Sequence, residues 1–349
     1  MLKLRRGVVV DEEPLTVDVD GQRRAAWADR SLVGEIRLGD EVVVNVEALD
    51  LGLGSGGFDL IHVNLTRGLA GGGADRAHVM KLNYTSLQHP VVPVERPAAG
   101  ARPNPLAAIP VLVIPVHGYL APAAWAAAQA AGGLQVGYVQ TGGGALPGSL
   151  SRDVARLRGR GLLCGQITAA PAYGGEREAL GVVGALDAAA GLGWEAAIAG
   201  PGPGVIGSET AYGHGGMVAL ESAHAALALG LTTLLGPRLS GADPRPRHRG
   251  VSHHTRAVLS LLLAGVDVPA PAAYEAEMAT LAELTGERHR LVGQAVDLDG
   301  YSTSGLASKV MGRGPQDDPI FFAAALASGT ALAQAARRDA PGEAQNELR

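Results

Sequence analysis

Several residue types that often mark a function are scarce in this sequence. Cys164 is the single cysteine among 349 residues, which excludes an intramolecular disulfide and any metal site built on several cysteines. Aromatic residues make up 4% of the chain, and no stretch reaches the roughly 18 unbroken apolar residues of a transmembrane helix. The N-terminal sequence MLKLRRGVVVDEE lacks the apolar core of a signal peptide. We therefore expect a cytoplasmic protein that does not bind membranes.

Lysine is also rare, so nearly all of the 29 basic residues are arginines. The formal net charge of −5 provides no general attraction to nucleic acid or to anionic lipid. Glycine, by contrast, is abundant: 50 of the 349 residues are glycine, about twice the usual share of roughly 7%. A chain of this composition uses glycine for tight turns and for close approaches between backbone segments.

The first 95 residues have the pattern of short strands. Five β-branched stretches are separated by turns rich in glycine or aspartate, and they are LTVDV (15–19), EVVVNVEAL (41–49), DLIHVNL (59–65), HVMKLNY (78–84) and HPVVPVE (89–95). The pattern predicts a small, closed antiparallel β-barrel over residues 1–95. Its strands lack clustered aromatic and basic residues, so we expect a structural or oligomerising role and no nucleic-acid partner. The Pro-rich sequence at 96–105 is the expected linker to a second domain.

Beyond the linker the chain alternates between apolar runs and Ala/Leu-rich segments. The runs are VLVIPVHG (111–118), LQVGYVQTGGG (134–144), LLCGQITAAPAYGG (162–175), EAAIAGPGPG (195–204), TTLLGPRLSG (232–241) and RLVGQAV (290–296). Each of the first five leads through a loop into a helical segment. This alternation predicts a Rossmann-like α/β domain over 106–336, with a mostly parallel, doubly wound sheet. The polar residues 337–349 are the expected flexible tail.

In such sheets, ligands bind beyond the carboxyl ends of the strands. Two glycine-rich loops fall there: TGGGALP, which contains Gly142 and Gly143, and GPGPGVIGSETAYGHGG, which contains Gly215. His117 directly follows the first predicted strand of the α/β domain and belongs to the same edge. The second loop matches neither GxGxxG nor a Walker motif, so its glycines indicate either close contact with a ligand or a tight turn.

The segment DPRPRHRGVSHHT, residues 243–255, concentrates cationic and titratable side chains. Its arginines are Arg245, Arg247 and Arg249. Ser252 fits the N-cap of the helix that follows, which places His253 in the first helical turn. Arginines beside the free amides of a helix N-terminus favour a phosphate or carboxylate ligand. In the alternative interpretation, the arginines pair with Asp243 or with other acidic side chains and only hold the loop.

The histidines allow acid–base catalysis, which needs one side chain with a pKa near neutrality. His254 or His214 would serve, and Glu209 is a further candidate base. Each histidine could equally brace or cap a loop, so the residue types alone leave both interpretations open.

A metal site is the other possibility, and it needs three or four nitrogen or oxygen ligands. Adjacent histidines point in different directions on a helix, so His253 and His254 are not expected to hold one ion together. The alternative set of ligands is His214, His248 and Asp243. No known zinc spacing is present in this region.

Four long motifs resemble those of one bacterial family, the domain of unknown function 3866. They are DPRPRHRGVSHHT, GSETAYGHGG, TGGGALPGSLSRDV and DEVVVNVEALDLGLGSGG. The resemblance covers nearly the whole chain, but it implies no reaction, cofactor or catalytic residue.

The sequence therefore supports three hypotheses. The first is an enzyme that acts on a phosphorylated or otherwise anionic small molecule, and the second is a non-catalytic regulator that binds such a ligand. The third is a metal-dependent hydrolase. Nothing in the sequence specifies a cofactor, and the expected partners are the anionic ligand and, through the barrel, a second copy of the chain.

Overall fold

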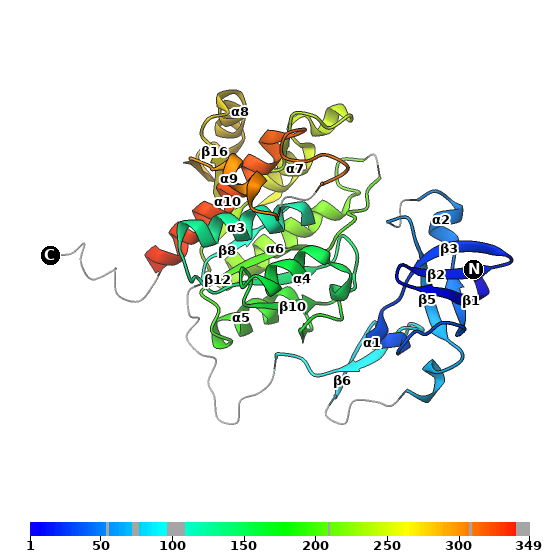
Figure 1. Ribbon diagram of the computed structural model, residues 1–349. Helices are drawn as coiled ribbons and strands as arrows, with labels where there is room; N and C mark the ends of the chain where they lie inside the picture. The colour runs from blue at the N-terminus through cyan, green and yellow to red at the C-terminus, as the bar shows by residue number, and fades with distance from the viewer. Residues whose placement is uncertain (54–55, 72–76, 96–108, 209, 307–308, 340–349) are drawn as a thin grey trace, which may run out of the picture. The chain divides into compact units, whose positions relative to one another are not determined.

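The computed structural model describes residues 1–53, 56–71, 77–95, 109–208, 210–306 and 309–339 (Figure 1). The chain forms two compact units, Met1–Val92 and Pro93–Arg349. The expected linker at 96–105 lies outside the described residues, as does 340–349 of the expected tail. Immediately before the linker, the Val94 N–H donates to the Glu178 carbonyl, so this stretch is tied to the second unit.

The first unit contains a closed barrel of five strands in the order β1-β2-β3-β5-β4. They are β1 (Leu4–Glu12), β2 (Leu15–Val19), β3 (Gln22–Trp27), β4 (Glu41–Asn45) and β5 (Asp59–Asn64). Alternation along the strands places valines and isoleucines inside, among them Val17, Val42 and Val44, which are fully buried. The β3–β5 pair is parallel and the other pairs are antiparallel, so the barrel is mixed rather than wholly antiparallel.

The predicted and observed strands of the barrel differ in one respect. The stretches at 78–84 and 89–95 contribute only a separate hairpin, β6 (Val79–Lys81) and β7 (His89–Val91). Their places in the barrel are taken by β1 and β3, whose solvent-facing arginines obscure the alternating pattern. Short helices join the strands, namely α1 (Arg30–Val33), α2 (Glu47–Asp50) and the 3₁₀ turn η1 (Gly68–Ala70).

The second unit is built on an eight-stranded, wholly parallel sheet in the order β11-β10-β9-β12-β8-β13-β16-β17. Its strands are β8 (Val111–Val113), β9 (Val136–Thr141), β10 (Gly165–Ala169), β11 (Arg177–Ala179), β12 (Ala196–Pro201), β13 (Thr233–Leu235), β16 (Asp267–Pro271) and β17 (Arg290–Gln294). The central strands are buried on both faces, which explains their continuous apolar sequences. The predicted α/β fold class is confirmed.

Helices cover both faces of this sheet (Figure 1). They are α3 (Leu120–Ala130), α4 (Arg152–Gly159), α5 (Val182–Gly191), α6 (Val218–Ala228), α7 (His253–Leu261), α8 (Glu275–Thr285), α9 (Leu298–Thr303) and α10 (Pro319–Asp339). Contacts link α5, α6, α7 and α8 into one layer, while α3 contacts α4, α9 and α10 in the other. The crossover directions agree with this division, because right-handed connections running opposite ways along a parallel sheet lie on opposite faces.

Helix α10 is long and apolar enough to cross a membrane by length and composition, yet 83% of its apolar window is buried inside the unit. It lies alongside α3 (Figure 1). A Cβ at Gly329 would sit 2.0 Å from the Ala123 carbonyl oxygen, so glycine allows this close approach of the two helices. The burial is that of a core helix.

Candidate functional site

The candidate residues lie beyond the carboxyl ends of the central strands of the parallel sheet. Strand β9 connects onward to β10, whereas its neighbour β12 connects to β13 in the opposite direction. This reversal is the topological switch point at which doubly wound sheets bind ligands. The loops after β8, β9, β12 and β13 carry His117, the TGGG sequence, the GHGG sequence and Arg238.

The two glycine-rich loops pack directly against each other. A Cβ at Gly215 would lie 1.8 Å from the Gly143 carbonyl oxygen, and a Cβ at Gly144 would lie 2.2 Å from the Gly202 carbonyl oxygen. Gly143 also has a φ of +87°, in the left-handed region. These glycines therefore bring backbone segments together, whereas the sequence also left open a role of Gly142, Gly143 and Gly215 in contacting a ligand.

His117 braces this edge from the 3₁₀ turn η2 (His117–Tyr119). Its Nε2 lies 2.7 Å from the Ser151 hydroxyl, and its Nδ1 lies 3.2 Å from the Pro201 carbonyl oxygen. Ser151 in turn caps α4, since its hydroxyl accepts from the Val154 N–H. Burial lowers the pKa of His117, so the imidazole is neutral. These bonds tie together three loops of the sheet edge.

Three arginines, one of them from the 243–255 segment, surround a fully buried carboxylate, that of Asp243. Arg245 donates to both carboxylate oxygens at 2.9 Å, and its N–H donates to the same group. Arg238 and Arg313 each lie 3.4 Å from the carboxylate. Burial raises the pKa of Asp243, but the bonds from Arg245 outweigh this effect and the pKa lies well below its usual range.

The other two arginines of the segment differ in their contacts. Arg249 donates to the Asp243 carbonyl oxygen at 2.9 Å, so it also holds the loop. Arg247 is exposed in the 3₁₀ turn η5 (Pro246–His248). Among the described residues, no acidic partner of Arg247 is found. The structural interpretation thus accounts for Arg245 and Arg249, and it leaves Arg247 open to a ligand.

Ser252 is the N-cap of α7, as the sequence predicts. Its hydroxyl accepts from the His254 N–H at 3.3 Å and lies 2.8 Å from His248 Nδ1. A short antiparallel pair, β14 (Leu239–Ser240) and β15 (Gly250–Val251), holds the loop that precedes the helix. The serine therefore fixes both the helix start and the orientation of one histidine.

Four histidine rings form one cluster beside this helix N-terminus. His214 and His254 stack face to face, with ring centroids 3.7 Å apart and ring planes 4° apart. His253 lies 4.5 Å from His254 and 5.1 Å from His214 by ring centroids. His248 packs against His253 and His254 at 4.8 and 4.9 Å. The cluster thus brings His214 together with the histidines of the 243–255 segment.

Each ring nitrogen in the cluster has its own environment. His214 Nε2 donates to the Ala211 carbonyl oxygen at 3.0 Å, which leaves the lone pair on Nδ1. His254 Nδ1 accepts from Arg238 Nη1 at 3.2 Å. Within the described part of the chain, His214 Nδ1 and His253 Nε2 are buried without a hydrogen-bond partner. Buried polar atoms of this kind call for a specific explanation.

Burial and the surrounding arginines keep the cluster neutral. Burial, then the charge of Arg238, lowers the pKa of His254 to about 2 and that of His248 to about 3. Burial, with neighbouring His214 and Arg247, lowers the pKa of His253 to about 4. Burial and the nearby arginines also lower the pKa of His214. Neutral imidazoles can accept a proton or bind a metal.

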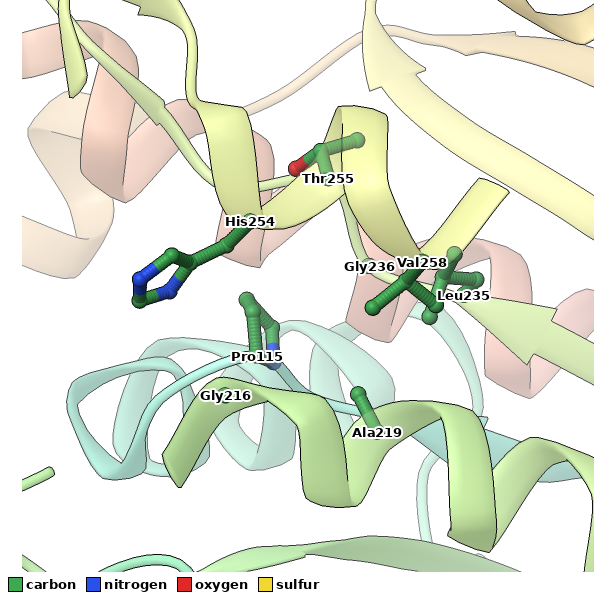
Figure 2. A pocket seen from close by; sticks show the side chains of 8 residues that line it. All are labelled: Pro115, Gly216, Ala219, Leu235, Gly236, His254, Thr255 and Val258. Atoms are coloured by element: carbon green, nitrogen blue, oxygen red, sulfur yellow. The ribbon is translucent and has the colours of Figure 1, made fainter. Parts of the chain in front are cut away.

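A small pocket opens beside the cluster, with room for about one water molecule (Figure 2). Figure 2 shows His254 on α7 on one side of Pro115, with Gly216 and Ala219 on the other side, and Thr255 also lines the pocket. The rest of the lining is apolar and includes Leu235 and Val258. His254 thus connects the polar cluster to the apolar interior between α6 and α7.

The structure departs from the sequence-based expectations at three points. His253 and His254 were expected to point in different directions, but both rings pack against His214, with centroid distances of 5.1 and 3.7 Å. Asp243 was a candidate metal ligand, yet arginines occupy its carboxylate. Glu209, the candidate base, lies outside the described residues.

The sequence analysis does not identify Arg238 as a residue of the site. Arg238 is buried, its side chain 4% exposed, and it touches both Asp243 and His254. It follows β13 directly in the sequence GPR, so a charged residue just after a buried strand was the available signal. The arginine-rich composition of the chain concealed it.

Fold and site define a class: a doubly wound parallel α/β domain preceded by a small mixed barrel, with histidines and arginines at the carboxyl edge of the sheet. Within that class, residues 25–329 match the family described as "Protein of unknown function (DUF3866)". The chain belongs to this family, as its motifs indicate. A search of curated proteins found no match, and neither did a search of solved structures.

Proposed function

We propose that the protein is an enzyme that binds a phosphorylated or otherwise anionic small molecule at the carboxyl edge of its parallel sheet. The observation that carries the proposal is the surplus of positive charge around Asp243. Among the described residues, three guanidinium groups contact this one carboxylate, and only Arg313 has a second acidic partner, Asp318, at 3.3 Å.

The surplus matters most at Arg238, because a buried charge needs a partner. Burial lowers the pKa of Arg238 to about 10, and within the described chain its Nε has no hydrogen-bond partner. The guanidinium remains charged at neutral pH, so an anion beside it would supply the missing counter-charge. Such an anion would also lie next to His254.

Arg247 supports the same location. Its charge contributes to the lowered pKa values of His214 and His253, so it lies near the cluster while its side chain remains exposed. An exposed arginine without an acidic partner in the described residues can reach a ligand at small structural cost. Arg238 and Arg247 would therefore contact the anion, while Arg245 and Arg249 hold the loop.

His214 is the candidate general base. Its Nε2–H bond to the Ala211 carbonyl orients the ring, and the lone pair on Nδ1 is available. A general base must lie within hydrogen-bond reach of the proton that it removes. Its position in the histidine cluster, near the two arginines, would allow it to act on a group next to a bound phosphate.

Calorimetric titration with inorganic phosphate, sulfate and a panel of small phosphorylated metabolites tests the proposal. One charge-assisted hydrogen bond contributes about 1.5–3 kcal/mol, so Arg247→Ala should weaken anion binding by about tenfold or more. The exposed Arg152 on α4 supplies a matched control, and Arg152→Ala should bind as the wild type does. Absence of anion binding by the wild type, or equal affinities of the two variants, would contradict the proposal. Turnover of a bound metabolite separates an enzyme from a non-catalytic regulator.

A further inference from the structure

Three of the four clustered histidines lie close enough together to hold one metal ion. One ring nitrogen from each of His214, His253 and His254 lies within 4.8 Å of the others. The sequence offered a different set, His214, His248 and Asp243, as an alternative group of metal ligands. In the described structure, Asp243 is held by arginines and His248 is turned to Ser252.

Two of these histidines present unused nitrogens to the cluster. His214 Nδ1 and His253 Nε2 are buried, and no hydrogen-bond partner for either is found among the residues described. A buried polar atom without a partner costs free energy, commonly about 1–3 kcal/mol. A bound ion at this place would remove that cost for both atoms at once.

Gly216 lets the rings of His214 and His254 pack closely against its backbone. A Cβ at this position would sit 2.7 Å from His254 Nδ1 and 3.0 Å from His214 Nδ1, closer than packed atoms allow. Both histidine nitrogens thus lie against this glycine, where any larger residue would displace the rings. Gly216 belongs to the turn η4 (Gly215–Met217), where its backbone has no positive φ that would by itself require glycine.

We infer that His214, His253 and His254 form a binding site for a divalent transition-metal ion, with Zn²⁺ as the best-matched class. Three imidazoles without thiolate or carboxylate ligands suit zinc, copper, nickel or cobalt rather than magnesium or calcium. This site goes beyond the proposed anion binding and does not depend on it; with a metal bound, the lone pair of His214 Nδ1 is a ligand and no longer serves as the general base.

Metal binding requires His254 to exchange its present hydrogen bond for the ion. His254 Nδ1 accepts from Arg238, so an ion that uses this atom displaces the guanidinium from it. The stacked rings of His214 and His254 would also turn, since ligand lone pairs lie in the ring plane. Both changes are side-chain rotations, and the absence of a Cβ at Gly216 avoids a clash with either ring nitrogen.

The arginines near the cluster disfavour a cation, because Arg238 and Arg247 add positive charge. Three neutral ligands leave the charge of the ion uncompensated, and they leave one position of a tetrahedral site open. Water or an anionic group fits that position. We therefore expect moderate affinity for the metal alone.

The experiment is a titration of metal-free protein, purified without a histidine tag, with Co²⁺ and then Zn²⁺ in a chloride buffer that contains no phosphate. We expect one ion per chain, with a visible Co²⁺ absorption band that Zn²⁺ abolishes. His253→Ala and Gly216→Ala should each weaken Co²⁺ binding by at least about tenfold. His224→Ala removes a histidine of the same unit outside the cluster and should leave the affinity unchanged.

Gly216→Ala is the sharper variant, because it removes no ligand and only displaces the rings of His214 and His254. Circular dichroism melting of each variant shows whether it is folded, and His214→Gln replaces His253→Ala if the latter unfolds. A wild-type protein that takes up no Co²⁺, or folded variants that bind as the wild type does, overturns the inference. Because phosphate is absent, that failure leaves the anion proposal standing.

Discussion

The barrel and the parallel α/β unit both bury carboxylates, and the charges around them differ. In the barrel, Asp40 pairs with Arg67 at 2.7 Å and also accepts from the Asn64 amide and the Arg37 N–H. Asp59 pairs with Arg24. In the α/β unit, Asp243 is shared by Arg238, Arg245 and Arg313.

The difference separates a structural ion pair from a candidate site. A buried carboxylate with one guanidinium and neutral donors has its charge balanced, so the barrel pairs leave no charge for a ligand to compensate. A buried guanidinium that shares its carboxylate with two others lacks full compensation, and a ligand can supply it. The unbalanced positive charge around Asp243 therefore makes the α/β unit the candidate location for a bound anion.

The largest expected effect comes from removing the shared carboxylate. Asp243→Asn would leave the buried Arg238 without its main partner, and breaking such a pair costs about 3–5 kcal/mol of unfolding free energy. Hydrogen exchange followed by mass spectrometry in denaturant should show faster exchange in the α/β peptides and unchanged exchange in the barrel peptides. A loss below about 1 kcal/mol would mean that Asp243 is not needed to hold the arginines.

The next largest effect is expected at Gly216, against which the rings of His214 and His254 pack. Gly216→Ala should destabilise the α/β unit by about 1–3 kcal/mol, because the added methyl overlaps two stacked rings. Gly132→Ala, where a Cβ would meet no atom within 4 Å, is the control in the same unit. Equal melting temperatures of the two variants would show that the rings are loosely packed.

Acid should affect the barrel through Asp40. The Arg67 guanidinium lowers the pKa of Asp40 from 3.8 to about 2, despite the opposing effect of burial. The stabilisation is therefore present above about pH 4 and is lost as pH falls through 2. Because solvent screens the half-exposed Arg67, we expect a loss of about 1–2 kcal/mol. Asp40→Asn should flatten the pH dependence of barrel unfolding, and an unchanged acid limb would assign it to other groups.

The smallest effect is expected at an exposed ion pair. Arg290 pairs with Asp267 on neighbouring strands, but its side chain is 58% exposed. Arg290→Ala should change the unfolding free energy by less than about 1 kcal/mol, and added salt should shrink the difference further. A larger loss of unfolding free energy would show that an exposed ion pair can contribute as much as a buried one. Burial would then not explain the large effect expected at Asp243.

Much of the fold followed from the sequence, because local patterns carry it. Continuous apolar runs such as 111–118 predicted parallel strands, and Ser252 predicted the start of α7. Patterns failed where two consecutive arginines interrupt the alternation of a strand, as Arg5 and Arg6 do in β1 and Arg23 and Arg24 do in β3. In β1, hydrogen bonds with the distant strand β4 hold the segment in an extended conformation, and the local sequence does not indicate this pairing.

By itself, the sequence determined which chemical groups meet at the carboxyl edge of the sheet, since strand order and chain direction bring the loops after β8, β9, β12 and β13 together. Only the tertiary structure decided their roles. It assigned Arg245 to Asp243, left Arg247 exposed, placed Arg238 against His254, and stacked that ring on His214. The physical reason is that pairing and burial depend on three-dimensional neighbours from separate segments, which spacing along one chain does not specify.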